Sequence, residues 1–271
     1  MDDISRFLSE DLKDEGDITS KSLFTTEKGK AVIIAKEDCV IAGLEEAKEV
    51  FKNTGAKTKT RSKDGDFVKR NTIIAEIDGT LISILTAERL ALNFLAKMSG
   101  ISTETKKLID RCKKINPRVT VAATRKTTPG FRKYEKKAVI LGGGEPHRYG
   151  LYDAAMIKDN HIKGVGSVKK AIEKIKQNIK NKTIEVEVEN ENDAITAAKL
   201  KVDVIMLDNF SPKKAKIITK KIREINPNIL IEISGGVNKE NIVKYASFAD
   251  RISLGYITHS IRSIDFSLEV I

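Results

Sequence analysis

The residues best suited to chemistry follow short apolar runs in the second half of the chain. Guanidinium and ammonium groups grip carboxylates and phosphates, through forked and point-charge contacts respectively. A pocket so rich in fixed positive charge would repel itself when empty, so we expect a polyanionic small-molecule substrate. The cations are Arg125, Lys126 and Lys158, with His147 and Arg148 in the loop between the first two runs, and the acids are Glu187 and Asp208.

Carboxylates alternate with valines in one of these runs. Glu185, Glu187 and Glu189 therefore share one face of a strand. In a closed barrel this alternation aims the acids inward, where a lysine or a divalent ion must neutralise them, whereas an edge strand would expose them to water. Asp208 is a second such acid, and a pair of carboxylates can hold magnesium bound to a diphosphate.

Glycine turns end the last two apolar runs, at Ser234-Gly235-Gly236 and Ser253-Leu254-Gly255. Barrels commonly build phosphate sites there from backbone N–H groups and a helix N-terminus. A single Gly-Gly pair is weak evidence, but two such turns agree with an anionic ligand.

Three other motifs leave an alternative open. Thr124–Gly130 combines cations with hydroxyls but also reads as a basic surface loop, and Gly142–Arg148 alone is only a flexible turn. Lys158 directly follows an apolar run and must find an anion, which a structural salt bridge to Asp159 or Asp153 would also supply.

Helix-length segments separate the apolar runs, which is typical of βα units with parallel strands. The carboxyl ends of such strands collect the chemistry at one rim. The predicted strands are 119–123, 155–157, 184–188, 204–207, 230–233 and 252–254, and the predicted helices are 168–179, 191–200, 212–225 and 239–246.

The first part of the chain reads as a smaller α+β domain, sandwich-like, over residues 1–103. Its strongest helix has apolar residues at 3.6-residue spacing from Ala87 to Met98, and Gly100 stands at the predicted C-terminal end. Residues 104–263 would form the barrel with the active site, and 264–271 could return to the small domain as an edge strand.

Composition narrows the class of protein. The net charge of +11 suits acidic metabolites, nucleic acid or a membrane surface, but 5% aromatic residues without tryptophan argue against nucleic acid. No apolar run approaches the roughly 18 residues of a spanning helix. The two cysteines lack metal-type spacing. We expect a soluble protein of the reducing cytoplasm, with no membrane and no nucleic-acid partner.

Six motifs occur in order along nearly the whole chain. They are Glu88–Asn93, Thr124–Gly130, Gly142–Gly144 with His147-Arg148, Ile157–His161, Glu185–Val188 and Leu207–Asn209, and Ser234–Gly236 and Gly255 with Thr258–Ser260 extend them. Together these motifs resemble quinolinate phosphoribosyltransferase, also called decarboxylating nicotinate-nucleotide pyrophosphorylase.

The resemblance implies an incomplete parallel α/β barrel with a smaller N-terminal α+β domain, assembled as a homodimer or higher homo-oligomer with shared active sites. It changes the interpretation of Arg89, which alone reads as a solvated surface residue. The implied quinolinate ligands are Arg89 from the neighbouring subunit, Arg125, Lys126, His147, Arg148 and Lys158. The implied phosphate ligands are Thr124, Ser234, Gly235, Gly236, Leu254 and Gly255. Glu187 and Asp208 would face the ribose and its Mg²⁺.

The implied reaction belongs to NAD biosynthesis. It joins quinolinate to phosphoribosyl pyrophosphate with magnesium, and yields nicotinate mononucleotide, pyrophosphate and CO2. A paralogue of the same fold that acts on another acid, such as a molybdenum-transport-associated relative or a nicotinate-using enzyme, is the alternative. The set Arg89, Arg125, Arg148 and Lys158 favours a dicarboxylate over a monocarboxylate.

Overall fold

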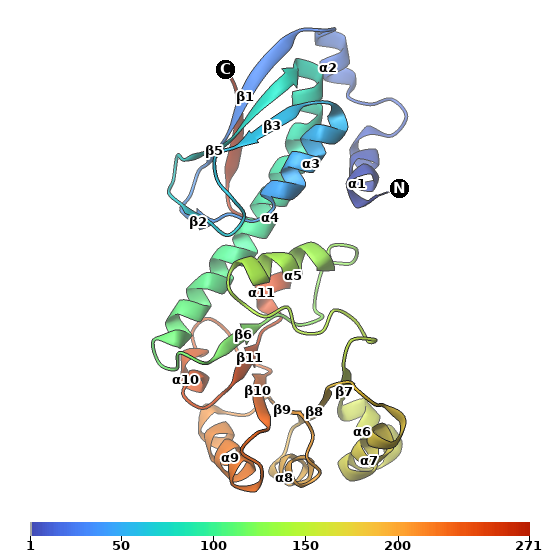
Figure 1. Ribbon diagram of the computed structural model, residues 1–271, viewed down its shortest axis with the longest axis vertical. Helices are drawn as coiled ribbons and strands as arrows, with labels where there is room; N and C mark the ends of the chain where they lie inside the picture. The colour runs from blue at the N-terminus through green and yellow to red at the C-terminus, as the bar shows by residue number, and fades with distance from the viewer. Residues whose placement is uncertain (1) are drawn as a thin grey trace. The chain divides into compact units, whose positions relative to one another are not determined.

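The computed structural model describes residues 2–271, and the chain divides into two units, each with its own sheet (Figure 1). The first unit comprises residues 1–106, 137–143 and 261–271. The second comprises residues 107–136 and 144–260. Among the described residues, no helix is long and apolar enough to cross a bilayer.

The first unit is built on an antiparallel sheet in the order β12-β1-β5-β3. Strand β1 alternates so that Ala31, Ile33 and Ala35 are fully buried, and Phe51 packs into the same core. Its elements are α1 (Asp3–Leu12), α2 (Ile18–Leu23), β1 (Lys28–Ala35), β2 (Cys39–Val40), α3 (Leu44–Thr54), β3 (Lys57–Thr60), β4 (Phe67–Val68), β5 (Ile73–Thr80) and β12 (Phe266–Val270).

Helix α4 (Leu81–Lys113) is longer than predicted. The prediction that Gly100 ends it is wrong, because the helix continues through this residue. A Cβ atom at Gly100 would lie 2.4 Å from the carbonyl oxygen of Arg262. The glycine therefore permits a close approach of the C-terminal segment and does not cap the helix.

The second unit holds a six-stranded parallel sheet in the order β6-β11-β10-β9-β8-β7, which confirms the predicted parallel α/β fold. Its two outer strands remain unpaired with each other among the described residues, so the barrel is incomplete. The strands are β6 (Thr120–Ala122), β7 (Ala155–Ile157), β8 (Ile184–Val188), β9 (Val204–Asp208), β10 (Leu230–Ser234) and β11 (Arg251–Ser253).

Helices connect these strands, and α7, α8 and α9 lie side by side along the sheet (Figure 1). Helix α9 illustrates why these helices form. Ser211 caps its N-terminus and Pro212 follows, and its apolar face buries Ile218 and Ile222. The helices are α5 (Arg132–Leu141), α6 (Asp159–Val165), α7 (Val168–Asn178), α8 (Glu191–Lys199), α9 (Pro212–Ile225), α10 (Val243–Ala246) and α11 (Tyr256–His259).

Candidate active site

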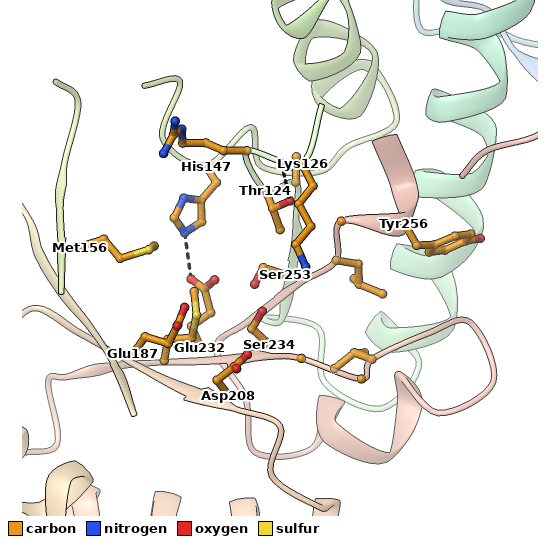
Figure 2. Close-up of a pocket in the computed structure, with 18 of the residues that line it drawn as sticks. Thr124, Lys126, His147, Met156, Glu187, Asp208, Glu232, Ser234, Ser253 and Tyr256 are labelled. Atoms are coloured by element: carbon orange, nitrogen blue, oxygen red, sulfur yellow. Dashed lines mark hydrogen bonds and ion pairs between the residues drawn. The ribbon is translucent and has the colours of Figure 1, made fainter. Parts of the chain in front are cut away.

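A cavity of about 650 Å³ opens at the carboxyl ends of the parallel strands, entirely within the second unit. Every predicted site residue except Arg89 lines it, and these side chains approach it from different strands (Figure 2). The predicted residues in its wall are Thr124, Arg125, Lys126, His147, Arg148, Lys158, Glu187, Asp208, Ser234, Gly235, Gly236, Leu254 and Gly255.

Two guanidinium groups form a cationic wall of this cavity. The Nε atom of Arg125 is buried and lacks a hydrogen-bond partner within residues 2–271. Arg148 donates to the Ala154 carbonyl at 3.2 Å, and burial together with the charge of Arg125 lowers its pKa. An anionic ligand would satisfy Arg125 and relieve this repulsion.

Lys158 forms an ion pair with Glu187 inside the cavity. The alternative salt bridges are not made, because Asp159 pairs with Lys163 at 3.0 Å and Asp153 accepts the Tyr149 N–H at 2.9 Å. Lys158 therefore faces the cavity with an acid beside it.

The predicted inward alternation on β8 holds for two of its three acids. Glu185 and Glu187 point inward, whereas Glu189 lies beyond the strand end and is exposed. The edge-strand alternative is wrong, because β8 pairs with both β7 and β9.

Asp208 shares the cavity with Glu187. Burial and then the charge of Glu187 raise the pKa of Asp208, and Lys158 partly opposes this. Two carboxylates in mutual repulsion are hard oxygen donors of the kind that Mg²⁺ takes together with substrate phosphates. These residues therefore fit the predicted magnesium ion.

A buried charge network lies below the cations. His147 Nε2 is 3.3 Å from Glu185 Oε2 and 3.3 Å from Glu232 Oε2, the latter contact being drawn in Figure 2. Arg251 Nη1 lies 3.1 Å from Glu232 Oε2, and Arg251 Nε lies 2.8 Å from Glu145 Oε2. Glu232 is 0% exposed.

The hydrogen bonds of His147 favour a proton-bearing network over a metal centre. In the neutral ring Nδ1 accepts the Arg148 N–H at 2.8 Å, so the single ring proton sits on Nε2 and faces the two acids. Protonation of the ring places a second proton on Nδ1 and gives up that hydrogen bond. Burial lowers the pKa of His147, but hydrogen bonds to Glu185 and Glu232 raise it to about 9. A protonated Nε2 has no lone pair for a metal.

Sequence reasoning missed Glu232 and Arg251. The available signal was a single carboxylate in the middle of an apolar strand, Leu-Ile-Glu-Ile-Ser, where an unpaired charge would be costly.

The glycine turns provide further donors in the cavity wall. Gly235 and Gly236 have φ of +71° and +62°, and a Cβ atom at Gly235 would lie 2.4 Å from Asn209 Oδ1 and 2.6 Å from Asp208 Oδ1. Within residues 2–271 the N–H groups of Gly235, Gly236 and Gly255 make no hydrogen bond. Such free N–H groups can bind phosphate oxygens.

Arg89 lies outside the cavity wall. It is exposed on α4, in the part of that helix that belongs to the first unit. Among the described residues, the cavity is lined only by the second unit.

Family comparisons cover nearly the whole chain. Residues 17–99 match the family described as "Quinolinate phosphoribosyl transferase, N-terminal domain", and residues 101–269 match "Quinolinate phosphoribosyl transferase, C-terminal domain". A protein of Archaeoglobus fulgidus named "Probable nicotinate-nucleotide pyrophosphorylase (carboxylating)" is 44% identical over 259 residues, 94% of this chain and 98% of that protein.

Two further relatives agree. The Nicotiana tabacum protein "Quinolinate phosphoribosyltransferase (decarboxylating) 1b" is 35% identical over 283 residues, 97% of this chain and 80% of that protein. The solved structure of the nicotinate-nucleotide pyrophosphorylase from Francisella tularensis has a TM-score of 0.93 and 38% identity, and the match covers 99% of this chain and 94% of that chain.

Proposed function

Because the chain belongs to the quinolinate phosphoribosyltransferase family, we propose that its cavity transfers the phosphoribosyl group of phosphoribosyl pyrophosphate to quinolinate, with loss of CO2, in NAD biosynthesis. The relatives named "carboxylating" carry a name that describes the reverse reaction, from mononucleotide and pyrophosphate. The observation that carries the proposal is the buried, unpartnered Arg125 Nε beside Arg148 in the cavity.

Quinolinate binds along the cationic wall. Arg125 and Arg148 hold its two adjacent carboxylates, and Lys158 adds a point charge. Lys126 and His147 also line the cavity and would fix the orientation of the ring. Binding in this way aims the ring nitrogen at the sugar, which converts a bimolecular step into an effectively unimolecular one.

Phosphoribosyl pyrophosphate binds on the other side. The free N–H groups of Gly235, Gly236 and Gly255 receive phosphate oxygens, with Thr124, Ser234 and Leu254 around them. Glu187 and Asp208 face the ribose and would hold Mg²⁺, which offsets the charge of the pyrophosphate when bound. Their negative charge also favours the positive charge that develops on the sugar.

The chemistry needs no protein nucleophile. The ring nitrogen forms a bond to the anomeric carbon while the bond to pyrophosphate breaks. The nitrogen is then cationic, so it accepts the electron pair released when the adjacent carboxylate leaves as CO2. The carbon that loses the carboxylate takes up one proton.

We propose a homodimer or a larger homo-oligomer in which Arg89 completes the neighbouring subunit's site. The exposure of Arg89 on α4 and its position in the family-like motif Glu88–Asn93 support this. The free, buried thiols of Cys39 and Cys112 suit a reducing compartment such as the cytoplasm.

The test mixes protein, magnesium and phosphoribosyl pyrophosphate with either quinolinate or nicotinate. We expect nicotinate mononucleotide and one CO2 per turnover from quinolinate only. Arg125→Ala and Arg148→Ala should each raise KM for quinolinate about 10-fold or more, as for loss of a charged hydrogen bond, with little effect on folding. If the protein used nicotinate and not quinolinate, the result would contradict the proposal. An unchanged KM for quinolinate in both variants would also contradict it.

A further inference from the structure

Helix α5 ties together the two loops that carry the quinolinate-facing cations. Arg132 Nε donates to Thr127 Oγ1 at 3.0 Å, and its Nη1 donates to the Tyr149 carbonyl at 2.8 Å. One turn later, Lys136 Nζ donates to the Pro146 carbonyl. The first loop contains Arg125, and the second contains Arg148, so both guanidinium groups depend on this helix for their placement.

Glu135 anchors the first loop from the same turn of α5. Its carboxylate accepts the Thr128 N–H at 3.0 Å and the Thr128 hydroxyl at 2.8 Å. Glu135 itself is 0% exposed. The loop after β6 is thus held in place by half-buried Arg132 and fully buried Glu135, which preorganises it.

Lys136 is the unusual member of this group. It is 0% exposed, and the acceptor of its ammonium is a neutral carbonyl. Its Nζ also lies 5.3 Å from the centre of the Tyr149 ring. An ammonium so deeply buried is costly, and a methionine would fill the same space without that cost. The charge therefore calls for a functional explanation.

The charges that surround Lys136 are mostly positive. Burial lowers its pKa to about 8, with contributions from Arg132 on α5, Arg125 after β6 and Arg148, and Asp153 opposes them. A bound anion would change the pKa of Lys136 in the opposite direction from these arginine charges. A dianion on Arg125 and Arg148 would favour the ammonium form of Lys136, and the ammonium would in turn favour the dianion.

We propose that Lys136 is a positioning residue of the quinolinate site. Its ammonium fixes the loop that carries His147 and Arg148, and it adds a third positive charge behind Arg125 and Arg148 that selects a doubly charged pyridine acid. Lys136 does not line the cavity, so it acts through these arginines and not on the substrate. The inference rests on the proposed function of the cavity.

The experiment compares Lys136→Met with Lys133→Met, a matched control at an exposed lysine of the same helix. In Lys136→Met we expect KM for quinolinate to rise about 10-fold or more, as for loss of a charged hydrogen bond, and KM for phosphoribosyl pyrophosphate to change less than about 2-fold. The control should keep both values. Circular dichroism and Tm establish that each variant folds.

The pH dependence of KM for quinolinate distinguishes the effect of the Lys136 charge from that of its packing. In the wild type, KM for quinolinate should rise at least about 3-fold from pH 7 to 9, as a group with a pKa of about 8 loses its proton. Lys136→Arg, which keeps its charge over this range, should remove the part of that rise that Lys136 causes and retain a low KM at pH 7. His147, whose pKa is about 9, accounts for the smaller part that remains.

An unchanged quinolinate KM in folded Lys136→Met would overturn the inference. If that variant does not fold, the wild-type profile decides, and a flat profile between pH 7 and 9 overturns it. Wild-type protein that does not consume quinolinate at any pH would instead contradict the proposed function, so the two failures remain distinguishable.

Discussion

Glu232 lies directly beneath His147, with its Oε2 atom 3.3 Å from Nε2 of the ring. Arg251 contacts the same oxygen, with its Nη1 at 3.1 Å. One buried carboxylate thus supports both the imidazole at the cavity wall and an arginine in the next strand. Because Glu232 and Arg251 are held by the parallel sheet, their contact fixes the orientation of His147 in the site.

Replacing Glu232 by glutamine should make stability less dependent on pH. The pKa of His147 is raised to about 9 in the fold, against about 6.5 when unfolded. The protonated ring therefore contributes stability that is complete below about pH 6.5 and is lost as pH rises through about 9. In Glu232→Gln the ring loses a charged partner, so the pH-dependent contribution shrinks.

Urea unfolding at pH 6 and pH 9.5 measures this effect. At pH 6 we expect Glu232→Gln to lower the free energy of unfolding by about 3 kcal/mol, as for a broken buried ion pair. The loss at pH 9.5 should be smaller. Glu224→Gln, at an exposed glutamate of α9, is the control. An equal loss at both pH values would contradict a role for the His147 charge.

Replacing Asp208 by asparagine should stabilise the protein while it impairs catalysis. Burial and the charge of Glu187 raise the pKa of Asp208, so the folded state disfavours its ionised form. That penalty is present above the folded pKa and disappears as pH falls through it. Because about 1 kcal/mol moves Tm by about 2–4 °C in a protein of this size, we expect a Tm rise of a few degrees at pH 7.

Activity should move in the opposite direction in Asp208→Asn. Loss of a charge aimed at the reacting sugar typically costs about 100-fold or more in kcat. Asn209 Nδ2 donates to Asp208 Oδ2 at 2.7 Å and can keep an acceptor in the variant. Calorimetry and steady-state kinetics on the same preparation provide the check. A lower Tm together with full activity would refute this interpretation of Asp208.

The parallel sheet and the cavity wall were predictable from sequence. Each apolar strand can be recognised by itself, and the site residues directly follow these strands. Lys158 and Asp208 follow apolar strands directly, and parallel strands bring their carboxyl ends to one rim. The Glu232–Arg251 pair was not predictable in this way. It depends on the register of two strands, in which these residues are direct partners, and local patterns do not encode register.

Helix α5 also escaped sequence reasoning. Four of its first six residues are cationic, so its apolar periodicity is weak, and tertiary contacts of Arg132, Glu135 and Lys136 supply much of its stabilisation. Gly100 was misread for a related reason. Its close approach to Arg262 joins residues far apart in the chain, whereas the sequence shows only a local stop signal.

Replacing Glu187 by glutamine should strengthen quinolinate binding in the absence of phosphoribosyl pyrophosphate. Lys158 forms an ion pair with Glu187, so a quinolinate carboxylate must compete for it. Lys158 is partly exposed, and pairs of this kind are worth about 0.2–1 kcal/mol. The Kd of Glu187→Gln for quinolinate should therefore be about 1.4- to 5-fold lower.

Isothermal titration of quinolinate into wild type and Glu187→Gln measures this change. Glu173→Gln, on the outer helix α7, is a matched control. Turnover should fall in Glu187→Gln despite the tighter binding, because the acid that faces the ribose is lost. Weaker quinolinate binding in the variant would show that Glu187 orients Lys158 more than it competes for it.

Arg89 and Asp208 should complement each other between subunits. If Arg89 completes the neighbouring site, Arg89→Ala and Asp208→Asn each inactivate a homodimer through different chains. A mixed dimer then has one site with both defects and one intact site. Since random exchange makes half of the dimers mixed, about a quarter of wild-type activity should return.

The assay mixes the two purified variants, allows subunits to exchange, and follows nicotinate mononucleotide formation over time. Arg70→Ala, at another exposed arginine of the first unit, should be fully active alone. Recovery must require exchange, so crosslinking each variant before mixing should abolish it. Full activity of Arg89→Ala alone, or no recovery after demonstrated exchange, would place Arg89 outside the site.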